Sequence, residues 1–114
     1  MKKSETFTLY DLHVEVVGDP KTFVCKHILG SAFVIQGENL VFDKQKTFSM
    51  YALAAMLPLL PAKQRPTHEN DWMTSDENIA CPDPHCGARF KISRTGVREF
   101  HRSDCTVVPI EKTA

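Results

Sequence analysis

Cysteine and histidine side chains occur as two closely spaced pairs in the last third of the chain. Cys81 and Cys86 have four residues between them, and His101 and Cys105 have three. Zinc in structural sites takes four nitrogen or sulfur ligands in a tetrahedron, and two such pairs can each supply two ligands. Fourteen residues separate the pairs, which is the length of a short hairpin. The spacing therefore predicts a Zn²⁺ site formed by Cys81, Cys86, His101 and Cys105.

The segment between the two pairs has the pattern of a β-hairpin. Residues 90–93 and 97–100 are β-prone runs, and residues 94–96 end in a glycine that favours a turn. An isolated two-stranded hairpin is marginally stable in water, whereas structural zinc contributes roughly 10 kcal/mol to the folding of small peptide domains. We therefore expect residues 81–105 to form a zinc-binding hairpin that depends on the metal for its order.

Other assignments of these side chains stay open. His85, Asp83 or Asp104 could compete as a ligand, because imidazole and carboxylate groups also bind metals. Alternatively, the cysteines are small buried hydrophobic side chains and the histidines are exposed. A redox role for the thiols is a third interpretation.

A further cysteine stands beside a histidine in the N-terminal half of the chain. In an extended segment Cys25 and His27 point to one side and Lys26 points to the other. A small cysteine-dependent enzyme or redox protein would use Cys25 or Cys81 as the thiolate, with His27 or His85 as its base. We rank this function below a non-catalytic, metal-stabilised accessory or interaction domain, because the sequence has no clear nucleophile and base signature. Whether Cys25 or His85 joins the metal site also stays open.

The strands that must position these side chains are indicated by apolar alternation. The runs with this pattern are residues 6–17, 31–35, 39–42, 78–81 and 88–93. The alternation slips at Tyr10 and Asp11, which predicts a β-bulge. Gly37 lies between two short runs and can adopt positive φ, which favours a hairpin there. The pattern predicts a small, mainly antiparallel sheet.

One principal helix is expected at residues 50–57. Ser49 can accept a hydrogen bond at its start, the run is rich in Ala, Leu and Met, and Pro58 ends it. Its apolar side chains predict that it packs on the sheet. Residues 62–77 are polar and predict a long surface loop, with Trp72 as an anchor into the core. The fold class is therefore α+β.

Length and composition set limits on the class of protein. The chain has 114 residues, which predicts one domain over residues 1–114. Fourteen basic residues balance fourteen acidic ones, so we do not expect a nucleic-acid partner. We expect a protein partner or a homo-oligomer instead. We find no export signal and no apolar run long enough to span a bilayer. We therefore expect a cytoplasmic protein with no membrane segment, reduced cysteines and no disulfide to Cys25.

The stretch from Cys25 to Arg94 resembles a small family of uncharacterised prokaryotic proteins known only by a numbered label. The matching features are Cys25 before a Gly-containing strand, the Ala- and Leu-rich helix, Trp72, the segment 79–83 that contains Cys-Pro-Asp, and the segment 90–94 that reads Phe-Lys-Ile-Ser-Arg. Two features depart from the family pattern: Thr47-Phe48-Ser49 replaces a segment that contains a cysteine, and residues 95–114 extend past the usual end. The resemblance implies a compact α+β domain and no particular activity.

Overall fold

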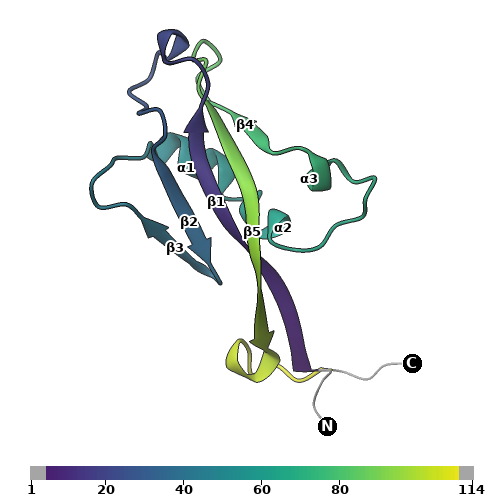
Figure 1. Ribbon diagram of the computed structural model, residues 1–114. Helices are drawn as coiled ribbons and strands as arrows, with labels where there is room; N and C mark the ends of the chain where they lie inside the picture. The colour runs from purple at the N-terminus through teal and green to yellow at the C-terminus, as the bar shows by residue number, and fades with distance from the viewer. Residues whose placement is uncertain (1–4, 111–114) are drawn as a thin grey trace.

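The computed structural model of the protein describes residues 5–110, which form a five-stranded antiparallel sheet with three short α-helices (Figure 1). The strands are β1 (Thr6–Val17), β2 (Ala32–Gln36), β3 (Asn39–Phe42), β4 (Asn78–Ala80) and β5 (Arg89–His101), in the sheet order β3-β2-β1-β5-β4. The helices are α1 (Met50–Met56), α2 (Leu60–Lys63) and α3 (Trp72–Ser75), and the 3₁₀ turns are η2 (Pro20–Thr22) and η3 (Arg102–Asp104). The predicted α+β class and antiparallel sheet are confirmed. The single principal helix is confirmed only in part, because α1 is the longest of three short helices.

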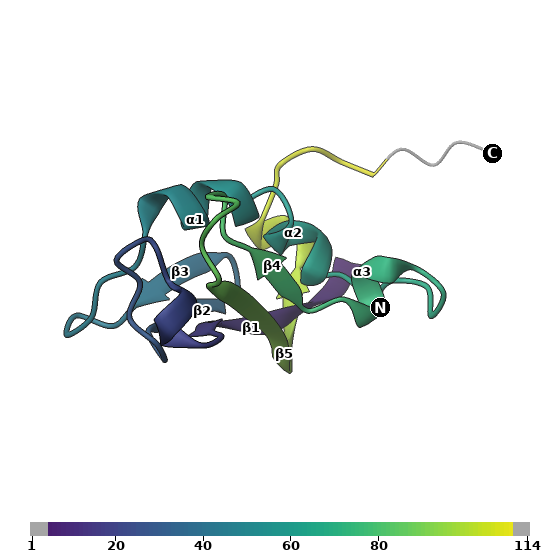
Figure 2. The same ribbon diagram turned by 90° about the horizontal axis from the view of Figure 1, so that it is seen from above.

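The core lies between one face of the sheet and the helices. Leu12, Val14 and Val16 of β1 are buried at alternate positions, as expected for a strand with one covered face. In the view of Figure 2, α1 and α2 lie on the same side of the sheet. Ser49 accepts a hydrogen bond from the N–H of Ala52 and begins α1, and the Met56 side chain is fully buried at its end. The predicted packing of this helix on the sheet is confirmed.

The predicted bulge is present between β1 and β5. Asp11 pairs with Gly96 and Leu12 pairs with Arg94, so Thr95 has no partner on β1. The irregularity lies at Asp11 as expected, but the extra residue belongs to β5. Beyond this point the two strands continue alone as a twisted ribbon toward η3 (Figure 1).

β5 is one strand of 13 residues, so the described structure has no hairpin within residues 81–105. Residues 94–96, which were expected to turn, stay in the strand because β1 pairs with residues 89–93 before them and with residues 97–101 after them. A turn and a bulge use similar residues, and the long partner strand favours the bulge here. The predicted zinc-binding hairpin is therefore corrected to one continuous, bulged strand, with Cys81 and Cys86 in the loop before its start and His101 and Cys105 at and after its end.

The loop between α2 and β4 is anchored by a lysine and not by the tryptophan. Trp72 is 60% exposed, so the predicted anchoring role is wrong. Lys63 is buried, and its Nζ donates hydrogen bonds of 2.6 Å to the carbonyls of Met73 and Asp76. These bonds hold the end of α2 against α3. Within residues 5–110, no helix has the length and apolar character that a membrane crossing requires.

Candidate metal centre

Two loops at one end of the sheet carry the candidate ligands. The first loop joins η2 to β2 and contains Cys25 and His27, whereas the second joins β4 to β5 and contains Cys81 and Cys86. Burial alternates along the first loop: Cys25 and His27 are half-buried, while Lys26 between them is exposed. An extended backbone therefore turns the thiol and the imidazole to the same side.

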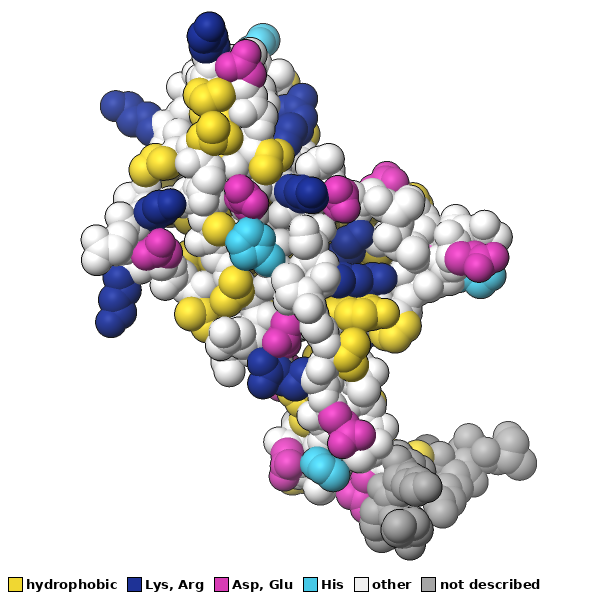
Figure 3. All heavy atoms as spheres, viewed as in Figure 1, with side chains coloured by type: hydrophobic (Ala, Val, Ile, Leu, Met, Phe, Trp, Pro, Cys, Tyr) yellow, Lys and Arg dark blue, Asp and Glu magenta, His cyan; other side chains and the backbone are white. Residues whose placement is uncertain are grey.

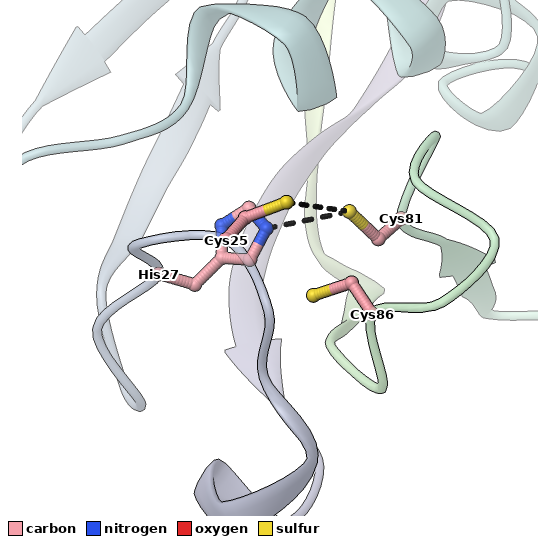
Figure 4. Close-up of side chains that lie close together, drawn as sticks. All are labelled: Cys25, His27, Cys81 and Cys86. Carbon is pink, nitrogen blue, oxygen red and sulfur yellow. Dashed lines mark hydrogen bonds between the residues drawn. The ribbon is translucent and has the colours of Figure 1, made fainter.

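The four side chains converge on a common point, as Figure 4 shows. Their ligand atoms, three Sγ atoms and one ring nitrogen, all lie within 4.8 Å of one another. The Sγ atoms of Cys25 and Cys81 are 3.9 Å apart, and Nε2 of His27 is 3.4 Å from Sγ of Cys81. In a tetrahedral zinc site with Zn–S bonds of about 2.3 Å and a Zn–N bond of about 2.0 Å, two sulfur ligands are about 3.8 Å apart and a sulfur and a nitrogen ligand are about 3.5 Å apart. The two measured separations are near these values and the other ligand atoms lie within 4.8 Å, so the cluster could hold a metal ion.

Backbone contacts place Cys86 at the cluster. Its N–H donates to the carbonyl of Asp83, which closes the turn that follows Cys81. The N–H of Val24 donates to Sγ of Cys86 at 3.3 Å, so the first loop also contacts the second. Next along the chain, the N–H of Gly87 donates to the carbonyl of Thr22. These bonds join the two loops directly beside the ligands.

Aromatic rings orient His27. Its imidazole packs edge-on against Phe90 of β5, with ring centroids 5.2 Å apart, and against Phe23 at 6.1 Å. Burial lowers the pKa of His27 below its ordinary value, because a low-dielectric surrounding disfavours the imidazolium. The ring is therefore neutral near pH 7, and a neutral imidazole is the form that binds metals.

Two of the thiols, those of Cys25 and Cys86, have pKa values that are shifted in opposite directions. The pKa of Cys25 is raised to about 12, first by burial and then by its hydrogen bonds to Cys81 and Cys86 and by their charges. Burial also acts to raise the pKa of Cys86, but the N–H groups of Cys25, Ala88 and Val24 outweigh it and lower this pKa to about 7. A divalent cation bound at the cluster would supply the positive charge that stabilises adjacent thiolates.

The structure brings together only half of the predicted ligand set. Cys81 and Cys86 lie in the cluster, but His101 ends β5 and Cys105 follows η3. A strand of 13 residues at about 3.3 Å per residue spans roughly 40 Å, so these two residues lie at the other end of the sheet. There, Sγ of Cys105 donates to the carbonyl of His101 at 3.4 Å.

Cys25 and His27 take the two remaining places. The signal for them in the sequence is the alternation of Cys25, Lys26 and His27, which predicts that the thiol and the ring share a side. Of the competing ligands, His85 is exposed and outside the cluster. Asp83 lies next to the cluster, and its Oδ2 accepts a hydrogen bond from the Cys25 thiol at 3.7 Å.

A cavity of about 600 Å³ adjoins the cluster. Cys25, His27 and Cys81 form part of its wall, and residues 47–51, which include the start of α1, form another part. Comparisons with protein-family models, with curated proteins and with solved structures found no match to this chain.

Proposed function

We propose that the protein is a small non-catalytic domain in which one Zn²⁺ is bound by Cys25, His27, Cys81 and Cys86, and that it acts as an accessory or interaction protein. One observation carries this proposal. Four ligand atoms from two loops that are 56 residues apart in the chain meet within 4.8 Å. Both loops lack regular secondary structure, so a metal ion that binds both of them would fix the position of each loop relative to the other.

The donor set supports zinc over magnesium and calcium. Three sulfurs and one nitrogen suit zinc in a closed tetrahedral site, whereas magnesium and calcium require oxygen ligands. With four protein ligands the ion has no open position for a substrate water, which is why we propose a structural role. Three thiolates and a neutral imidazole leave the Zn²⁺ site with one excess negative charge. Arg89 lies beside the site, with its guanidinium donating to the carbonyl of Cys86 at 3.3 Å, and can offset this charge.

The resemblance seen in the sequence agrees with this site. The matching stretch runs from Cys25 to Arg94 and contains all four ligands, whereas His101 and Cys105 lie in the extension beyond it. We therefore propose that the chain is related to that small prokaryotic family, and that the site lies in the shared part. A reducing compartment such as the cytoplasm would keep the thiols available to the metal.

The metal content of the protein tests the proposal. The protein is purified without added zinc and analysed for elements, and we expect one zinc per chain. Cys81→Ser should lower this ratio well below one, whereas Cys105→Ser, at the other end of β5, should leave it unchanged. Zinc loss in Cys105→Ser with retention in Cys81→Ser would refute the site. Cobalt replacement provides a second readout, because a tetrahedral site with three sulfurs gives strong visible absorption.

A cysteine-dependent enzyme or redox protein is the second candidate, and the cavity of about 600 Å³ beside Cys25 and Cys81 is the observation that favours it. Against it, the thiol of Cys25 in the cavity wall has a pKa of about 12, and Cys86, whose pKa is about 7, is buried. A reactive cysteine needs both a low pKa and access. Rapid alkylation of Cys25 near pH 7 in the zinc-loaded protein would favour this candidate over the structural site.

A further inference from the structure

The outer edge of β3 is apolar on both faces of the sheet. Leu40, Val41 and Phe42 are 39%, 43% and 41% exposed, and Figure 3 shows hydrophobic side chains on the left flank, over β2 and β3. Proteins that stay monomeric usually protect an edge strand with a charge, a proline or a bulge. Between Asn39 and Phe42, β3 has none of these.

The pairing of β3 with β2 shows which backbone groups are free. Gln36 pairs with Asn39 across a turn of two residues, and such a turn is closed by a hydrogen-bonded pair. Hydrogen-bonded and non-bonded pairs alternate in an antiparallel ladder. The N–H and C=O groups of Leu40 and Phe42 are therefore directed away from β2, toward the open edge.

We propose that β3 pairs antiparallel with β3 of a second copy of this chain, around a two-fold axis at Val41. In this register the two Val41 side chains face each other, and Leu40 of each copy lies opposite Phe42 of the other. Leu40 and Phe42 are the residues whose backbone groups point outward, so each such pair exchanges both of its hydrogen bonds. The backbone and the apolar side chains thus favour the same register.

Charge complementarity supports this register. Moving outward from the axis, Asn39 lies opposite Asp43 of the second copy, and the turn that contains Glu38 comes beside the turn at residues 43–46 of the second copy, which contains Lys44. Within residues 5–110, neither Glu38 nor Lys44 forms an ion pair in the single chain. β4, the strand at the other edge of the sheet, has only three residues and offers a shorter surface. Two paired strands of four residues bury less surface than the range of about 1,200–2,000 Å² that is usual for stable complexes. The dimer should therefore be weak and depend on concentration.

Sedimentation velocity of the full chain over a wide concentration range tests the proposal. We expect a monomer–dimer equilibrium that persists after zinc is removed, because β3 lies outside the metal centre. Val41→Lys should weaken the dimer at least tenfold, because it places two lysines opposite each other. Val97→Lys is the matched control: Val97 is 66% exposed on β5, and its substitution should leave the equilibrium unchanged. Circular dichroism checks that both variants fold.

A charge exchange tests the register itself. Glu38→Lys and Lys44→Glu should each weaken the dimer several-fold, and the double variant should restore it. A wild-type chain that stays monomeric at millimolar concentration would overturn the proposal, as would a dimer that survives Val41→Lys. Recovery of a different protein strand on β3, with no self-association, would also overturn it. Loss of the dimer on zinc removal would place the interface at the metal centre instead.

Discussion

The N–H of Gly87 donates a hydrogen bond of 2.9 Å to the carbonyl of Thr22, which joins the loop that contains Cys81 and Cys86 to the one that leads to Cys25. The approach is so close that a Cβ at position 87 would lie 2.5 Å from Cβ of Thr22 and would overlap its hydroxyl. Only glycine fits there without a shift of the backbone. This contact therefore controls the distance between the two halves of the candidate metal centre.

Gly87→Ala should both destabilise the protein and weaken metal binding. Overpacking of a tight contact costs roughly 1–3 kcal/mol, and here it would also move Cys86 away from the other ligands. Chemical denaturation gives the free energy of unfolding, and competition with a chromogenic chelator gives zinc affinity. Gly96→Ala is the control, because a Cβ there meets no atom within 4 Å and should change both quantities little. Equal effects of the two substitutions would show that the Thr22 contact does not position the site.

Removing the metal should loosen the two loops and leave the sheet intact. A ligand present at a concentration of about 1,000 times its dissociation constant stabilises the folded protein by about 4.1 kcal/mol. Removal of the metal by a chelator should therefore lower the melting temperature by more than roughly 10 °C. Hydrogen exchange should increase in residues 22–30 and 81–88, and in particular at the N–H of Val24, which donates to Sγ of Cys86. β1 and β2 should keep their protection. Faster exchange confined to residues 97–105 would instead agree with the hairpin expected from sequence.

Local patterns were sufficient to predict most of the fold. Alternation predicted β1, Ser49 predicted the start of α1, and Gly37, with φ of 65°, supplies the turn between β2 and β3. The alternating residues 90–100 fit either a hairpin or one long strand, because both have a period of two. The choice depended on β1, which is long enough to pair with all of β5. That information lies in a contact between distant segments and not in residues 90–100.

Only two of the four candidate ligands were predicted from the sequence, because the other two also depend on contacts between distant segments. The short spacing of Cys81 and Cys86 is a local signal. Cys25 reaches them through contacts with residues 56 positions away, and His27 is oriented by Phe90. Sequence spacing cannot rank such a pair above His101 and Cys105, which have an equally suitable spacing. The alternation predicted that the Cys25 and His27 side chains point to the same side, but not that they face Cys81 and Cys86.

Lys63→Met should destabilise the protein. The substitution removes both hydrogen bonds from Nζ and leaves the carbonyls of Met73 and Asp76 without their donor. Both hydrogen bonds are partly buried, and an unsatisfied acceptor that is fully buried costs about 1–3 kcal/mol, so we expect a loss near the lower end of that range. Burial lowers the pKa of Lys63, because a low-dielectric surrounding disfavours its ammonium. Urea unfolding measures the loss.

Lys91→Met provides the comparison for Lys63. Lys91 forms an exposed ion pair with Glu77 at 3.6 Å, and such pairs contribute about 0–1 kcal/mol. We expect the Lys63 variant to lose more free energy of unfolding than the Lys91 variant. In the Lys63 variant, hydrogen exchange should also increase across α3. A ranking in the opposite order would mean that Lys63 does not anchor this segment.

Asp11 should stabilise the folded protein near pH 7, and this contribution should be lost in acid. Its pKa is lowered, first by the hydrogen bond from Arg98 and then by that from the N–H of Gly37, which together outweigh burial. Arg98 contacts the carboxylate through Nε at 3.1 Å and through a terminal guanidinium nitrogen at 2.8 Å. A carboxylate with a lowered folded pKa contributes its full stability above the unfolded value of about 3.9. That stability is lost as the pH falls through the lower, folded value.

Asp11→Asn removes this titration and tests the sign. The variant should be less stable than the wild type at pH 7, and the difference should shrink as the pH falls below about 4. Urea unfolding from pH 7 to pH 3 measures it, with Asp43→Asn on an exposed turn as the control for the loss of a carboxylate. Arg98→Gln should reproduce the effect, and combining it with Asp11→Asn should add little, because both remove one interaction. A difference between wild type and Asp11→Asn that stays constant down to pH 3 would show that the carboxylate does not stabilise the bulge through its charge.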